Sequence, residues 1–180
     1  MSSYKEIVTK TIIGKGKKTT TANFKIIPEQ KPDTVLGCWV INHQFKGIND
    51  IDGVKVNGSF DINVWYSYDN DTKTAVSTKK FNYNDTMNVA LKEDSDLSNN
   101  SEIIVRSLKQ PTVTDVSTEE GEIKMNVEKE LGVEVVGDAK VKILVSDDED
   151  DYDIIPDNET EITEEIIENI DLDINEDYIT

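Results

Sequence analysis

The sequence contains one cysteine and one histidine, Cys38 and His43, which lie on either side of Trp39. A thiol and an imidazole within hydrogen-bonding reach could form a nucleophile and its general base. In an extended segment, side chains five positions apart lie on opposite faces, so we expect these two to be separated and to have packing roles. No further histidine or cysteine is present to complete a zinc site.

Residues 14–19, GKGKKT, resemble a phosphate-binding loop. A P-loop has two glycines five positions apart, followed by Lys and then Ser or Thr. Here Thr11 stands five positions before Gly16, and a second lysine, Lys18, follows Lys17. We therefore expect no nucleotide site and interpret the segment as a basic turn between two strands.

Two acidic triplets, residues 69–71 (DND) and 94–96 (DSD), resemble the start of a calcium-binding loop. Such a loop needs Gly at its sixth position and Glu at its twelfth, and the twelfth residues here are Lys80 and Val105. Acidic residues are also too numerous to single out a pair for glycoside hydrolysis. The sequence thus predicts no catalytic residue, no metal site and no cofactor, and we do not expect an enzyme.

In the segments that must position these residues, apolar side chains recur at every second position, which is typical of half-buried β-strands. Apolar residues occupy even positions through residues 54–68 and odd positions through residues 123–145. No helical period occurs before residue 158. We predict an all-β fold, with an antiparallel β-sandwich or barrel-like body.

Individual residues predict where the strands bend or end. Gly58 is expected to bend or bulge its strand, and Pro111 to mark an edge strand or a bulge. Residues 69–71 and 119–121 are expected to be turns. Gly137 and Asp138 suit a two-residue hairpin loop, which would divide the run 123–145 into two strands.

The charge is concentrated at the C-terminal end. From Asp147 onward there are sixteen of the 37 acidic residues and no Lys or Arg, which leaves 21 acids against 19 bases before it. We therefore predict a β-rich domain over residues 1–145, for which the family resemblance described below implies self-assembly, and an acidic tail over 146–180. So acidic a chain is expected to bind neither nucleic acid nor an anionic membrane.

No apolar stretch has the length of a signal peptide or a membrane span, so we expect no membrane insertion and a soluble protein kept inside a cell.

The tail interleaves its acids with isoleucines spaced four apart, which predicts one apolar face of a helix that binds a partner. The alternative is a disordered, solubilising tail. The residues of this predicted face are Ile162, Ile166, Ile170 and Ile174.

Trp65 occupies the polar parity of its strand, beside Asp61 and Asn63. Either a neighbouring loop covers it or it is exposed at a protein interface, where tryptophan is enriched.

Several segments around these residues resemble the CotE family of outer spore coat proteins. Residues 61–68, DINVWYSY, match that family's segment in full, and residues 37–43, GCWVINH, are similar to its G-x-W-[IV]-I-N-H stretch, with Cys38 replacing a second glycine. Residues 4–10, 110–111 and 134–141 resemble further blocks, so the likeness spans nearly the whole chain. The motif residues that we consider for an interface are Gly37, Trp39, Asn42, His43, Asp61, Asn63, Trp65, Tyr66, Tyr68, Gln110, Pro111 and Gly137.

The resemblance implies a morphogenetic scaffold without enzymatic activity. CotE-like proteins are made in the mother-cell cytoplasm and deposited in the spore coat. They self-associate around the forespore, recruit other coat proteins, and are thought to dock on the basement layer built by the ATPase SpoIVA. We expect the β body to multimerise through sheet edges or aromatic patches and the tail to capture partners.

The N-terminal segment is basic and could meet a neighbour's acidic tail. Two other classes stay open: a β-sandwich binding module for a surface or a carbohydrate, and an acidic-tailed chaperone for basic coat proteins.

Overall fold

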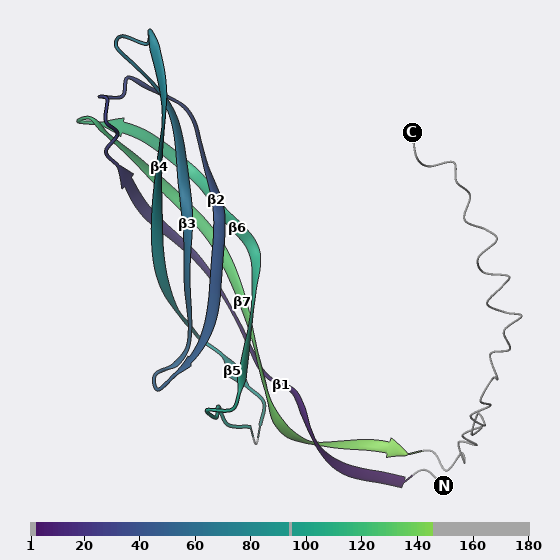
Figure 1. Ribbon diagram of the computed structural model, residues 1–180. Helices are drawn as coiled ribbons and strands as arrows, with labels where there is room; N and C mark the ends of the chain where they lie inside the picture. Colours follow the sequence, from purple (N-terminus) through teal and green to yellow (C-terminus); the bar gives the residue numbers. More distant parts are fainter. Residues whose placement is uncertain (1–2, 94, 146–180) are drawn as a thin grey trace, which may run out of the picture. The chain divides into compact units, whose positions relative to one another are not determined.

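The computed structural model describes residues 3–93 and 95–145, which form two antiparallel β-sheets (Figure 1). This confirms the predicted all-β fold. Among the described residues there is no helix, and therefore none that is long and apolar enough to cross a membrane. The predicted tail over residues 146–180, with its isoleucine face, lies outside the described residues.

The first sheet has four strands in the order β5-β1-β7-β6, and the second has three in the order β2-β3-β4. Most strands are far longer than the five or six residues usual in globular proteins. Their bounds are β1 Ser3–Ile26, β2 Thr34–Asp50, β3 Gly53–Tyr68, β4 Lys73–Met87, β5 Ala90–Leu91, β6 Glu102–Glu119 and β7 Glu122–Val145.

The core lies between β3, the central strand of the second sheet, and β7, which lies between β1 and β6 in the first sheet. Their alternating apolar side chains point into the space between the sheets, as the period of two predicts. The buried residues form two clusters, one around Phe60, Ile62, Val64, Met125 and Val127, the other around Val54, Val56, Leu131, Val133 and Val135.

The second sheet is bulged on β2 and not at Gly58. The pairing of β3 with β4 runs without interruption through Gly58 and Tyr83, whereas the pairing of β2 with β3 shifts between Ile41 and Gln44. A Cβ atom on Gly58 would lie 2.3 Å from the Tyr83 ring, so this glycine makes room for the tyrosine. The expected bulge at Gly58 was therefore wrong, and the alternative that Gly58 bends its strand stays a prediction.

The bulge on β2 changes which side chains face the core. Asn42, at its centre, has a φ of 55°, a left-handed conformation that asparagine tolerates better than most residues. Cys38 packs against the core before the bulge, and the His43 ring lies 6.3 Å from the core residue Phe60 after it. The expectation that Cys38 and His43 point to opposite faces was wrong, because the extra residue reverses the alternation.

Two predicted turns are instead parts of continuous strands. Gly137 and Asp138 lie inside β7, where a Cβ atom on Gly137 would come within 2.6 Å of Ile13 Cδ1. The segment 14–19 lies inside β1, where a Cβ atom on Gly16 would come within 2.2 Å of the Asn88 carbonyl oxygen. Both glycines permit close packing of neighbouring chain segments, and the expected hairpin and basic turn were wrong.

The other expected turns are confirmed. Residues 69–71 all have positive φ and connect β3 to β4, and Glu120 and Gly121 form the two-residue loop between β6 and β7. Pro111 lies in β6, which is an edge strand, at a register shift between Lys109 and Thr112. This position suits proline, which has no backbone N–H to donate to a hydrogen bond between strands.

Candidate functional site

The two most distinctive sequence motifs are neighbouring strand segments. Residues 37–41 of β2 pair with residues 61–65 of β3, with Gly37 opposite Trp65 and Trp39 opposite Asn63. Val40 of β2 and its partner Ile62 of β3 point to the core. The residues before and after them on each strand therefore point to the outer face of the three-stranded sheet. The pairing thus gathers the conspicuous aromatic and polar motif residues on one outer face.

This face carries the most prominent exposed aromatic surface of the described residues. The side chains of Trp39 and Trp65 remain 42% and 43% exposed, so no loop covers Trp65. Gly37 lies between them, since a Cβ atom there would be 3.2 Å from the Trp39 ring and 3.9 Å from the Trp65 ring. Val76 of β4, opposite Trp65, is 59% exposed. We call Gly37, Trp39, Trp65 and Val76 the tryptophan surface.

Polar side chains border the tryptophan surface. The Asn42 amide nitrogen donates to Asp61 Oδ2 at 2.8 Å, which links the bulge of β2 to β3. Thr78 of β4 donates to Asn63 Oδ1 at 2.7 Å. An apolar centre with a polar rim is the usual layout of a protein–protein interface.

His43 belongs to a different, inward-facing group. Its Nε2 lies 2.7 Å from the Tyr83 hydroxyl, and its Nδ1 lies 3.2 Å from Gln110 Oε1. These hydrogen bonds connect β2, β4 and β6 and so cross from one sheet to the other. His43 and Gln110, two motif residues far apart in the sequence, are thereby brought together.

The same group continues into a buried ion pair. Lys129 Nζ of β7 lies 2.6 Å from Asp85 Oδ2, 3.2 Å from Thr20 Oγ1 and 4.1 Å from the centroid of the Tyr83 ring. Both charged residues are buried, and they lie between the two apolar core clusters. A buried charge is tolerated when it is paired and hydrogen-bonded, as it is here.

The ionisation of these groups does not favour nucleophilic catalysis. Burial raises the pKa of the Cys38 thiol to about 11, so the reactive thiolate is scarce at neutral pH. Burial, followed by the charge of Asp85, raises the pKa of Tyr83 to about 12. Burial is also the main cause that lowers the pKa of His43, so its imidazole is neutral at pH 7. Within the described part of the chain, no group of three or more His, Cys, Asp or Glu residues could hold a metal ion.

The remaining motif residues serve the core. Tyr66 is 2% exposed and its ring lies 6.3 Å from that of Tyr68, which also packs on the first core cluster. Pro111 and Gly137 are buried as well. The motif therefore contains two sets of residues, one that shapes the outer tryptophan surface and one that fixes the packing behind it.

Sequence reasoning missed Lys129, Asp85 and Tyr83 as a group. A signal was present: Lys129 interrupts the apolar parity of residues 123–145, and Asp85 interrupts that of its own strand between Tyr83 and Met87. Two opposite charges at inward-facing positions of different strands predict a buried ion pair, provided that the strands face each other.

Comparison with known proteins identifies a family to which this chain is similar. A family model described as outer spore coat protein E (CotE) matches residues 3–177. No curated protein and no solved structure matches the chain. The family match spans all three strands that contribute to the tryptophan surface and nearly all of the sequence.

Proposed function

The chain belongs to the outer spore coat protein E (CotE) family, and from this premise we propose that it is a morphogenetic scaffold that self-assembles around the forespore and recruits outer-coat proteins. Family membership supports a place in the spore coat. The observation that carries the scaffold role is the tryptophan surface, an exposed aromatic patch built by the two most specific motif segments.

The chemistry of this surface suits association with another protein. Tryptophan is enriched among the residues that contribute most to binding, and truncating such a residue typically costs about 2 kcal/mol or more. Trp39 and Trp65 lie on paired strands, and a tryptophan side chain has only two torsions to restrict, so little side-chain entropy is lost on binding. We propose that the tryptophan surface is one contact between copies in the coat layer.

Recruitment is assigned to the tail. Residues 147–180 carry sixteen acidic side chains without a base, and a layer of such tails would bind basic coat proteins multivalently. An array of weak contacts can exceed the affinity of a single contact by about 100-fold or more. We also propose synthesis in the mother cell and docking of the layer on the basement layer built by SpoIVA.

The first experiment is light scattering over a wide concentration range on the full chain, on a chain that ends at Val145, and on the double variant Trp39→Ala/Trp65→Ala. Large assemblies from the first two would locate self-association in residues 1–145. The double variant should need at least about tenfold more protein to assemble, because tenfold corresponds to only 1.4 kcal/mol.

Ile51→Ala is the matched control for this experiment, since Ile51 is fully exposed at the turn between β2 and β3, away from the tryptophan surface. Unchanged assembly of the double tryptophan variant would remove the tryptophan surface from the proposal. A full chain that stays monomeric at every concentration would remove the scaffold itself.

A second candidate function is a carbohydrate- or surface-binding module. It is favoured by the same two exposed tryptophans, because indole rings on a rigid sheet can stack on apolar faces of a ligand. A glycan array would test it: specific binding that disappears in Trp39→Ala/Trp65→Ala would support this function.

A further inference from the structure

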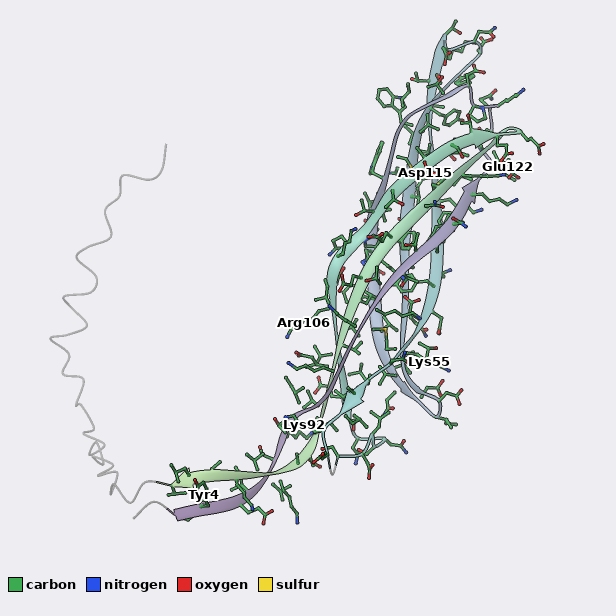
Figure 2. The ribbon with its side chains drawn as sticks, turned by 180° about the vertical axis from the view of Figure 1, so that it is seen from behind. Tyr4, Lys55, Lys92, Arg106, Asp115 and Glu122 are labelled. Carbon is green, nitrogen blue, oxygen red and sulfur yellow. The ribbon has the colours of Figure 1, made fainter. Side chains whose placement is uncertain are left out.

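The first part of β1 has an open edge. β5 pairs with Gly14 and Lys15, and the Lys92 amide donates to the Ile13 carbonyl oxygen at 2.8 Å. Before Ile13, the only strand beside β1 among the described residues is β7, on its other side. Both figures show these two strands continuing together past the others, to Tyr4 at the far end in Figure 2. Residues 4–12 therefore offer one row of backbone groups for a further strand.

The side chains on this segment are exposed and of mixed character. Tyr4 and Val8 are 73% and 68% exposed and share one face of the strand with Glu6, Lys10 and Ile12. An exposed two-stranded ribbon with apolar side chains is marginally stable alone.

The charges of β1 differ between its two parts. Farther along the strand, Lys15, Lys17 and Lys25 pair with glutamates of β7. We therefore restrict the hypothesis that the basic N-terminal segment meets a partner to the open segment, residues 4–12. Glu6 and Lys10, in the open segment, form no ion pair with any described residue.

We propose that this open edge binds the same edge of a second copy, antiparallel and about a two-fold axis at Val8. This inference rests on the proposed self-assembly and names one of its interfaces. Since the Ile13 carbonyl faces β5, the odd-numbered residues present their backbone groups to the open edge. In the paired edges Ile7 would then exchange hydrogen bonds with the second copy's Thr9, and Lys5 with its Thr11.

The even-numbered residues would form the close, non-hydrogen-bonded pairs in which side chains touch most strongly. Val8 would face the second copy's Val8, Tyr4 would face its Ile12, and Glu6 would face its Lys10. By symmetry the ion pair and the Tyr4 contact each occur twice. The segment is thus complementary to itself in both charge and apolar character.

Two independent features select this register. The free segment runs from Tyr4 to Ile12, and Val8 is its midpoint, so the second copy would end where β5 begins. Moving the axis by one residue in either direction would place Glu6 opposite Val8 or opposite Ile12 and leave both charges without partners. Only the register centred on Val8 uses the whole edge and pairs the charges.

The opposite edge of the ribbon is less suited to self-pairing. β6 pairs with β7 as far as Val136, so the free part of β7 is residues 137–145, whose midpoint is Val141. Pairing about Val141 would place Lys140 opposite the second copy's Lys142 twice. Like charges directly opposite each other destabilise a strand pair, so β1 is the favoured edge.

Charge exchange tests the register on the full chain, with the dimer dissociation constant measured by sedimentation at concentrations below those of large assemblies. Glu6→Lys and Lys10→Glu should each weaken the dimer about tenfold or more, since each creates two like-charge pairs and removes two ion pairs. The double variant Glu6→Lys/Lys10→Glu should regain an affinity close to that of the original chain. Lys5→Glu is the matched control, because it changes the net charge as Lys10→Glu does but faces Thr11.

Disulfide trapping provides a second measurement. Val8→Cys places the two new thiols opposite each other at a non-hydrogen-bonded position and should form a covalent dimer under a mild oxidant. Ile7→Cys is the control, because Ile7 would face Thr9 and its own counterpart would lie farther away. The native Cys38 has a raised pKa and is present in both variants.

Equal weakening by Lys5→Glu and Lys10→Glu, or failure of the double variant to recover, would overturn the interface. Equal trapping of Val8→Cys and Ile7→Cys would do the same. If large assemblies persist in those cases, the scaffold function stands and only this interface falls. A full chain that stays monomeric at every concentration would overturn both the scaffold function and this interface.

Discussion

At the scale of single residues, the interior of this protein depends on one polar group set between two apolar clusters. Lys129 and Asp85 are buried side by side, and Tyr83 and His43 extend the group to β2. A buried ion pair adds little net stability over well-packed apolar residues, but removal of one partner leaves an isolated charge. The pair connects β7 of the first sheet to β4 of the second.

Replacing one member of the ion pair should therefore be far more harmful than replacing both. Lys129→Met should lower the free energy of unfolding by about 3–5 kcal/mol, because the buried Asp85 carboxylate loses its cation. The double variant Lys129→Met/Asp85→Leu should recover much of this loss. Urea denaturation of both single variants and the double variant measures the coupling. Additive losses would contradict a direct interaction between the two side chains.

His43 should make stability depend on pH. Burial lowers the pKa of His43 below its unfolded value of 6.5, so the unfolded chain binds the proton more readily than the folded one. The stability that neutral His43 contributes to the folded state is fully present above pH 6.5. It is lost as the pH falls through the lower pKa of His43 in the folded chain.

We expect the urea midpoint of the original chain to fall between pH 7.5 and 5.5, and the fall to be smaller in His43→Gln, which keeps hydrogen-bonding capacity without titrating. The difference between the two proteins isolates the histidine from the carboxylates. Parallel pH profiles would show that His43 does not titrate differently in the folded state.

At the scale of the elements, glycines decide where the long strands can approach one another. Gly16 of β1 lies against the backbone at Asn88, where the chain leaves β4 and crosses to the first sheet as β5. The Lys18 amine donates to the Thr86 carbonyl oxygen at 3.1 Å just beside this point. The close approach therefore joins the two sheets along one side.

Gly16→Ala should be strongly destabilising, since its Cβ atom would lie 2.2 Å from a backbone oxygen that cannot move without disturbing the crossover. Overpacking of this kind typically costs about 1–3 kcal/mol. Gly132→Ala is the control, because the atoms nearest to its new Cβ atom would belong to the Leu108 side chain, at 3.0–3.5 Å. Thermal unfolding of both variants measures the difference. A Gly16→Ala variant as stable as Gly132→Ala would contradict the close approach.

At the scale of the whole molecule, the charge and the surfaces that could associate belong to different parts of the chain. The body is nearly neutral and carries the tryptophan surface and the open edge of β1, whereas the tail carries almost all of the net charge of −18. One two-fold interface alone produces a closed dimer. The β1 edge together with the tryptophan surface would give each copy two separate interfaces, so that assembly can continue beyond a dimer.

Tails of like charge should oppose this assembly. In the full chain, raising the salt concentration to about 0.5 M should lower the protein concentration at which large assemblies appear, because salt screens charges separated by more than a few ångströms. A chain that ends at Val145 should assemble at lower concentration and depend less on salt. Light scattering at low and high salt measures both. A salt response that survives truncation would place the repulsion in the body instead.

The sequence by itself determined the all-β class, the turns at residues 69–71 and 119–121, the edge position of Pro111, the charge of the tail and the resemblance to the family. Each depends on local properties, namely side-chain alternation, turn-forming residues and composition. Much of the tryptophan surface could also be anticipated, since Trp65 stands on the polar parity of its strand.

Only the tertiary structure decided the roles of the glycines, the face of His43 and the partners of Lys129. A glycine in a turn and a glycine under a neighbouring strand look the same in the sequence, and Gly137 and Gly16 proved to be the second kind. The bulge at Asn42 reverses the alternation by one residue and so returns His43 to the core. The Lys129–Asp85 contact depends on which strands face each other across the core. That arrangement is set by the long-range packing of the two sheets, which no local pattern encodes.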